Sequence, residues 1–259
     1  MYRLQIILFL IFASKLLNGQ TDKFETEHFK VKYDVEAEKY AKASIKVLEL
    51  AWTIATRNNF YLPDKIKFTI KNSDRNVLYF DRKSLSGITL EYKTMDTFDS
   101  PKQGGKNNIY GLCHELGHLC MYNTATNKNN WMSYNFRESW ADFWGNYVID
   151  SVHAELGSDF WPNPYDYLEF YGSDYMTKRI HENNLKIADF NKAGKFWIEL
   201  NSIVGFKYLN LIFEQVNELK VSNPDAEEEF LTVLKTVSDN EKIVDLFRQY
   251  SDILIIKQE

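Results

Sequence analysis

The chain has 259 residues, of which 44% are hydrophobic and 26% charged, a composition typical of a globular protein and not of a disordered or repetitive one. Its 31 Lys and Arg residues against 36 Asp and Glu residues give a formal net charge of −5, without a long basic run. A nucleic-acid-binding protein is therefore not expected, because binding to phosphates needs a basic surface. Two cysteines also exclude a disulfide-stabilised miniature fold.

The first 20 residues have the pattern of a secretory signal peptide. One Arg lies near the start, residues 4–13 are apolar except for one Gln, and small and polar residues follow. Ser14 and Lys15 interrupt the apolar run well before the roughly 20 residues that a spanning helix needs. We therefore expect cleavage near residue 20 and a secreted or periplasmic protein without a stable membrane span. The alternative is an uncleaved anchor, in which Leu16 and Leu17 extend the apolar run.

Apolar periodicity predicts a strand, a long helix and three further strands in the N-terminal part. Residues alternate between apolar and polar over Glu27–Tyr33, which predicts a strand, and helical spacing over Val35–Asn58 predicts a helix. Three short segments bounded by polar turns are expected to be strands: Lys65–Lys71, Asn76–Phe80 and Gly87–Tyr92.

Helices are expected to dominate the remainder of the chain. A loop over residues 100–107 precedes two predicted helices, Asn108–Tyr122 and Phe136–Val152. The aromatic-rich stretch 160–175 contains two prolines and is expected to be a loop, either lining a substrate pocket or packed beneath its neighbours. Four further helices are predicted at Ala193–Val204, Phe206–Leu219, Pro224–Val237 and Asn240–Ile255.

These elements predict an α+β fold in two parts. A mixed strand and helix part covers residues 21–155, and a mainly helical part covers residues 156–259. We see no internal repeat, and we expect no inhibitory pro-segment between residue 20 and the first predicted strand.

An HExxH motif, formed by His114, Glu115 and His118, lies on the first of the two central helices. Two imidazoles one helical turn apart can bind one zinc ion, and the intervening Glu can act as a general base. At about 100° per residue both histidines share one face, opposite a face of apolar residues. Cys113 and Cys120 lie on the apolar face, with Cα atoms about 10 Å apart along the helix, which is too far for a disulfide. We expect two free, buried thiols.

The motif alone leaves the third metal ligand open. The metzincin continuation needs Gly at position 121 and His at position 124, but Met121 and Thr124 stand there, so that class is excluded. The alternative is a carboxylate from a second helix, and Glu138 lies 20 residues after His118.

Between Gly111 and Gly145 the sequence resembles the thermolysin-like gluzincins, whose second motif is a ligand Glu, an Asp four residues later and a Gly three after that. The resemblance implies a zincin-like fold, one zinc ion with Glu138 as its third ligand, and Asp142 as the group that orients the His114 ring. Independently, Glu138, Asp142 and Gly145 share one helical face, and Gly145 would let the helices approach closely. Aromatic residues on the opposite face are expected to enter the core: Trp140, Phe143, Trp144 and Tyr147. The alternative is that both carboxylates are merely solvated.

Two His and one Glu leave a fourth zinc position open to water, as catalytic sites do. Glu115 is then the expected general base in the hydrolysis of a protein or peptide substrate. Tyr134, one turn before Glu138, and His181 are the candidates for stabilising the oxyanion. The resemblance also implies an edge strand beside the active-site helix that holds the substrate backbone. Its expected residues are Gly87, Ile88, Thr89 and Leu90.

The sequence therefore predicts an exported zinc metallopeptidase. An endopeptidase is favoured, because the Gly-x-Met-Glu-Asn segment with which aminopeptidases hold a free amine is missing. One alternative is a catalytically silent zincin-fold binding or adhesion module, although Glu115 has no reason to be retained there. The other is a zinc hydrolase that acts on a non-peptide amide or ester, since the motif specifies water activation and not the acyl group.

Overall fold

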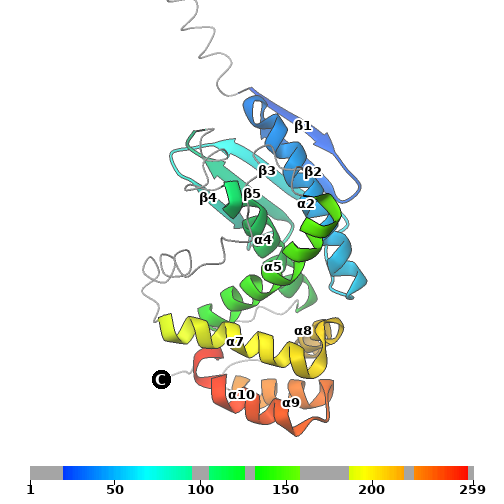
Figure 1. Ribbon diagram of the computed structural model, residues 1–259, viewed down its shortest axis with the longest axis vertical. Helices are drawn as coiled ribbons and strands as arrows, with labels where there is room; N and C mark the ends of the chain where they lie inside the picture. The colour runs from blue at the N-terminus through cyan, green and yellow to red at the C-terminus, as the bar shows by residue number, and fades with distance from the viewer. Residues whose placement is uncertain (1–19, 95–104, 126–131, 158–186, 219–224, 256–259) are drawn as a thin grey trace, which may run out of the picture.

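The chain forms an α+β structure in which a five-stranded sheet lies at one end and a group of helices at the other (Figure 1). A computed structural model describes residues 20–94, 105–125, 132–157, 187–218 and 225–255. The expected signal peptide, the aromatic-rich stretch 160–175 and His181 lie outside the described residues.

The sheet is mixed, with strand order β1-β2-β3-β5-β4. Both β2–β3 and β3–β5 pair in parallel, whereas the outer pairs β1–β2 and β4–β5 are antiparallel. The strands are β1 (Thr21–Glu25), β2 (Phe29–Asp34), β3 (Ile66–Asn72), β4 (Val77–Phe80) and β5 (Gly87–Tyr92).

The expected strands are all present, but the expectation that Gly87–Leu90 forms an edge is wrong. The chain turns back after β4 through a short hairpin connection, so β5 lies between β3 and β4 and its backbone is paired on both sides. The edge beside helix α4 (Gly105–Thr124) is therefore β4.

One face of the sheet is buried beneath helix α2 (Glu38–Arg57) and α4, and the other carries charged side chains. Apolar residues alternate onto the buried face, for example Val31 and Phe68, while Lys30 and Lys67 are exposed on the opposite face. The expected helix over Val35–Asn58 is confirmed as a short 3-10 turn, Val35–Ala37, followed by α2.

Glu91 of β5 is buried on the otherwise charged face and is held by basic side chains. Lys71 Nζ lies 2.9 Å from its Oε1 atom, and Arg75 Nε donates to its Oε2 atom. The hydrogen bonds from Arg75 and Lys71 lower the pKa of Glu91 to about 2. This carboxylate is therefore ionised at every physiological pH.

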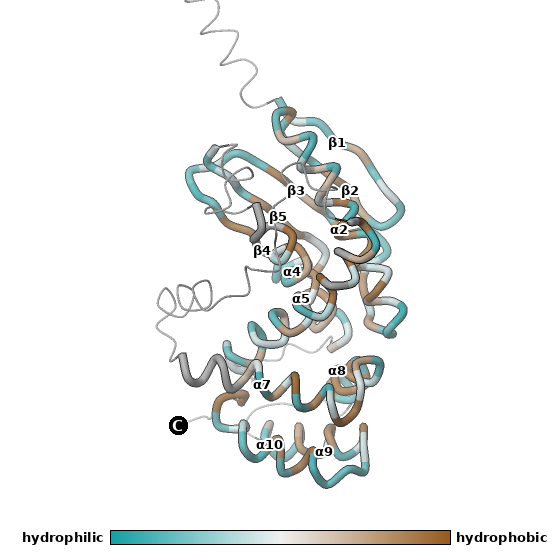
Figure 2. The backbone as a smooth tube through the Cα atoms, viewed as in Figure 1, coloured by the Kyte–Doolittle hydropathy of each residue, from teal (hydrophilic) through white to brown (hydrophobic). Residues whose placement is uncertain are grey.

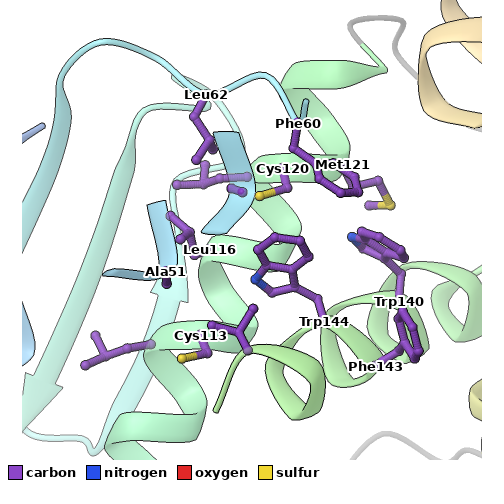
Figure 3. Close-up of a cluster of buried hydrophobic side chains, with 14 of the residues drawn as sticks. Ala51, Phe60, Leu62, Cys113, Leu116, Cys120, Met121, Trp140, Phe143 and Trp144 are labelled. Atoms are coloured by element: carbon purple, nitrogen blue, oxygen red, sulfur yellow. The ribbon is translucent and has the colours of Figure 1, made fainter. Parts of the chain in front are cut away.

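The central helices α4 and α5 (Tyr134–Leu156) pack tightly against each other. Trp140 Nε1 on α5 donates a hydrogen bond to the Gly117 carbonyl oxygen on α4 at 2.9 Å. Trp144 lies against α4 beside Leu116 (Figure 3). Both helices are longer than expected, and α4 already begins at Gly105, so the prediction of a loop through residue 107 is wrong for its last three positions.

The four predicted C-terminal helices are present, with ends within three residues of the prediction except that the first begins six residues earlier. They are α7 (Ile187–Val204), α8 (Leu209–Glu218, preceded by a 3-10 turn at Phe206–Tyr208), α9 (Ala226–Val237) and α10 (Glu241–Leu254). Their apolar sides face one another and α5, whereas the outer sides of α9 and α10 are hydrophilic (Figure 2).

A single cluster of buried apolar residues extends from the sheet through α4 and α5 into these helices, so the core continues across the expected boundary at residue 155. Trp140, Phe143 and Trp144 are buried as expected. Tyr147 is different, because its side chain is exposed and stacks on Phe206 at the edge of this core. Within the described ranges, no helix combines the length and apolar character needed to cross a membrane.

Candidate metal site

Three side chains from α4 and α5 converge at the centre of the molecule. His114 and His118 lie on successive turns of α4, and Glu138 lies near the start of α5. The Nε2 atom of His114 is 3.5 Å from Glu138 Oε2, and the Nε2 atom of His118 is 3.5 Å from Glu138 Oε1. Both histidines are almost completely buried, and the two 3.5 Å separations show that these three residues come together.

The spacing of these atoms fits a shared metal ion better than direct hydrogen bonds. Zn–N and Zn–O bonds of about 2.1 Å in a tetrahedral site place neighbouring ligand atoms about 3.4 Å apart. An N–H···O hydrogen bond normally spans about 2.7–3.2 Å. In the part of the chain that the structure describes, His114, Glu115 and His118 also form the group that could hold a metal ion, with ligand atoms within 4.8 Å of one another.

The ring of His114 is oriented by a buried carboxylate, as expected. Its Nδ1 atom lies 2.6 Å from Asp142 Oδ1, so Nδ1 carries the proton and the Nε2 lone pair faces Glu138. The Tyr110 hydroxyl donates to the same Asp142 oxygen at 2.5 Å. Tyr110 was not predicted, although it precedes His114 by one helical turn and therefore shares its face.

The ring of His118 is held by packing. It stacks on Phe80 of β4, with ring centroids 4.8 Å apart, and lies edge-on to the His114 ring at 4.7 Å. Its Nδ1 atom is buried without a hydrogen-bond partner among the described residues. The two imidazoles are therefore oriented by different means, one by a carboxylate and the other by an aromatic ring.

Glu115 connects the site to the edge of the sheet. The backbone N–H of Phe80, the last residue of β4, donates to Glu115 Oε2 at 3.0 Å. Glu115 is buried and belongs to the cluster with the two histidines. The candidate general base thus lies between the ligand atoms and the edge strand.

Glycine lets the two helices approach closely enough to bring Glu138 to the histidines. A Cβ atom on Gly145 would lie 3.0 Å from Tyr110 Cε2 and 3.4 Å from the backbone nitrogen of His114, which confirms the close approach expected there. Gly117 was not predicted to have this role, yet a Cβ atom there would lie 2.7 Å from Trp144 Cδ1. Because Gly117 lies within the HExxH motif at a position that the motif leaves open, the sequence alone does not indicate this role in helix packing.

The two thiols play no part in the site. Cys113 and Cys120 are free and buried in the apolar cluster on the other side of α4 (Figure 3), as expected. Burial raises the pKa of Cys113 to about 12 and that of Cys120 well above its usual range. Both remain protonated, and a protonated thiol is a poor ligand and a poor nucleophile.

The remaining predicted residues are placed as follows. Tyr134 is the first residue of α5, one turn before Glu138, and is half-buried. Gly87, Ile88, Thr89 and Leu90 lie in β5, where β4 separates them from the edge of the sheet.

No protein-family model matches the chain, and a search of curated proteins finds no match either. The function is therefore inferred from the site itself.

Proposed function

We propose that the chain is an exported, zinc-dependent metallopeptidase with a zincin-like fold. The observation that carries the proposal is the convergence of His114, His118 and Glu138 on one point, with Glu115 beside that point and in contact with an edge strand. Two imidazoles and one carboxylate are the donor set of a catalytic zinc site, which keeps one position for water. The signal-like N-terminus supports export.

Each residue of the site has a chemical task in peptide hydrolysis. A bound zinc ion would supply Lewis acidity toward the substrate carbonyl and toward water. Glu115 accepts the proton of the attacking water and delivers it to the leaving amine nitrogen. Asp142 holds the His114 tautomer that presents a lone pair, and Tyr110 fixes Asp142. Tyr134, which precedes Glu138 by one turn, and His181, which lies outside the described residues, remain the candidates for stabilising the oxyanion.

The edge strand β4 offers a place for the substrate backbone. Asp81 N donates to the Gly87 carbonyl oxygen at 2.7 Å, and this bond shows which β4 residues have backbone groups that face β5. Backbone groups alternate along an antiparallel strand, so those of Leu78 and Phe80 face away from β5. Because the Phe80 N–H already donates to Glu115, an extended peptide can add to this edge through the backbone groups of Leu78, with its scissile carbonyl beside Glu115.

The Glu115→Gln variant tests this proposal. Glutamine preserves the size of the side chain and a carbonyl oxygen for the Phe80 N–H but cannot take the proton. We expect the variant to bind zinc as the unchanged protein does and to lose at least about a hundredfold in casein cleavage. Glu228→Gln, at an exposed position of α9, serves as the matched control. Undiminished cleavage by the zinc-loaded Glu115→Gln variant would refute the proposal.

A further inference from the structure

A column of stacked rings leads from the metal site toward the surface. Phe80 stacks on both His118 and Tyr122, with ring centroids 4.8 and 5.4 Å apart. The guanidinium carbon of Arg82 lies 5.8 Å from the centroid of the Tyr122 ring, and Arg82 Nη2 is 3.4 Å from the Tyr122 hydroxyl oxygen. The column therefore ends in an exposed positive charge.

Arg82 has no carboxylate partner among the residues that the structure describes. The nearest acid along the chain, Asp81, is engaged within its own turn, where Lys83 N and Ser84 Oγ donate to it at 2.9 and 2.7 Å. The hydrogen bonds from Ser84 and Lys83 lower the pKa of Asp81. In the metal site, Glu138 lies against the two histidines and Glu115 accepts a hydrogen bond from the Phe80 amide.

Arg137 provides a second positive charge, on α5 directly before the candidate ligand Glu138. Its Nη1 atom donates to the Met132 carbonyl oxygen at 2.9 Å, and within the described ranges it forms no ion pair. Burial raises the pKa of Tyr122, the charges of Arg137 and Arg82 act in the opposite direction, and the charge of Glu138 acts in the same direction as burial. Of the two guanidinium groups, that of Arg82 contacts the Tyr122 hydroxyl.

The turn that carries Arg82 is fixed to the active-site helix. Asn123 Nδ2 donates to the carbonyl oxygens of Leu85 and Leu119 at 2.9 Å each, and Leu85 N donates to the Asp81 carbonyl oxygen. This turn directly follows β4. Arg82 is thus held two residues beyond the end of the edge strand.

We propose that Arg82, in contact with Tyr122, and Arg137, next to Glu138, form a subsite for a carboxylate group of the peptide substrate. The four residues from His118 to Tyr122 advance about 6 Å along α4, and an extended peptide covers about 3.3 Å per residue. The carboxylate therefore lies about two residues from the scissile bond. It is either an acidic side chain or the C-terminal carboxylate, and both suit guanidinium groups that form no ion pair with the described residues.

This inference rests on the proposed peptidase function, so the experiment separates the two. Fluorescence-quenched peptides carry Glu or Gln at each position flanking the central bond in turn, and a second series ends in a free acid or an amide. We measure kcat/KM with the zinc-loaded protein and, independently of turnover, the Kd of the same peptides for the Glu115→Gln protein.

We expect a preference of about tenfold for the carboxylate peptide over its neutral counterpart in one of the two series. The preference should fall to about one in Arg82→Gln and be reduced in Arg137→Gln, whereas Arg248→Gln, an exposed position on α10, should retain it. Whichever series shows the preference identifies an acidic side chain or a C-terminus as the ligand.

Cleavage of the peptides without a carboxylate preference would overturn the subsite while leaving the peptidase proposal intact. A carboxylate preference in Kd that Arg82→Gln abolishes, without cleavage by the unchanged protein, would support the subsite and overturn the peptidase proposal. A preference that survives in both arginine variants would also overturn the assignment of the subsite.

Discussion

Replacing Asp142 with Asn tests whether the buried carboxylate supports metal binding. Its Oδ1 atom lies 2.6 Å from His114 Nδ1 and accepts the Tyr110 hydroxyl at 2.5 Å, and the residue is only 5% exposed. Asn preserves the shape and an acceptor oxygen but removes the negative charge that favours the metal-bound imidazole.

We expect Asp142→Asn to weaken zinc binding by about 10- to 100-fold, which corresponds to about 1.4–2.7 kcal/mol. Competition with a chromophoric zinc chelator measures this change, and far-UV circular dichroism establishes that the variant is folded. Asp252→Asn, an exposed position on α10, should bind zinc normally. The reasoning fails if folded Asp142→Asn protein holds zinc as tightly as the unchanged protein does.

Three further predictions concern stability. Gly117→Ala should destabilise the protein by about 1–3 kcal/mol, because its Cβ atom would meet Trp144 at 2.7 Å. Gly194→Ala should not destabilise it, because the space around Gly194 is open. Urea denaturation compares the two variants, and equal midpoints would contradict the close approach of the helices. The pKa of Glu91 is about 2 instead of 4.5, so its contribution exists above pH 4.5 and is lost as the pH falls toward 2. The stability difference between the unchanged protein and Glu91→Gln should therefore shrink over that range, and a constant difference would refute the assignment. Zinc at a hundredfold excess over its Kd should add about 2.7 kcal/mol, so a chelator should lower the thermal midpoint, and no shift would argue against binding to the folded state.

The helices and the ligand set could be predicted because their information is local. The 3.6-residue period places His114 and His118 on one face and Cys113 on the other, and the spacing of Glu138 and Asp142 on a second helix follows the same rule. The convergence of candidate metal ligands from two helices is thus visible in the sequence.

The strand order could not be predicted in this way. Strand β1 was missed, because its side chains are mostly exposed and only Phe24 is apolar, so no alternating pattern marks it. Which strand lies at the edge depends on long-range pairing. The pattern within Gly87–Tyr92 does not reveal that β4 pairs with the side of β5 that faces away from β3.

The residues that support the site were also hidden. Tyr110 and Gly117 act through contacts with the neighbouring helix, so their roles appear only once α4 and α5 are placed together. Arg82 reaches the site through a turn fixed by Asn123, a contact between residues far apart in the sequence.

The central claim is that His114, His118 and Glu138 bind one catalytic zinc ion, and metal analysis tests it most directly. The zinc content of the purified mature protein is measured beside that of Glu138→Ala, with casein cleavage assayed with and without a chelator. We expect about one zinc ion per chain, weaker binding in the variant, and cleavage that the chelator abolishes. A folded protein that binds no zinc under these conditions would contradict the account.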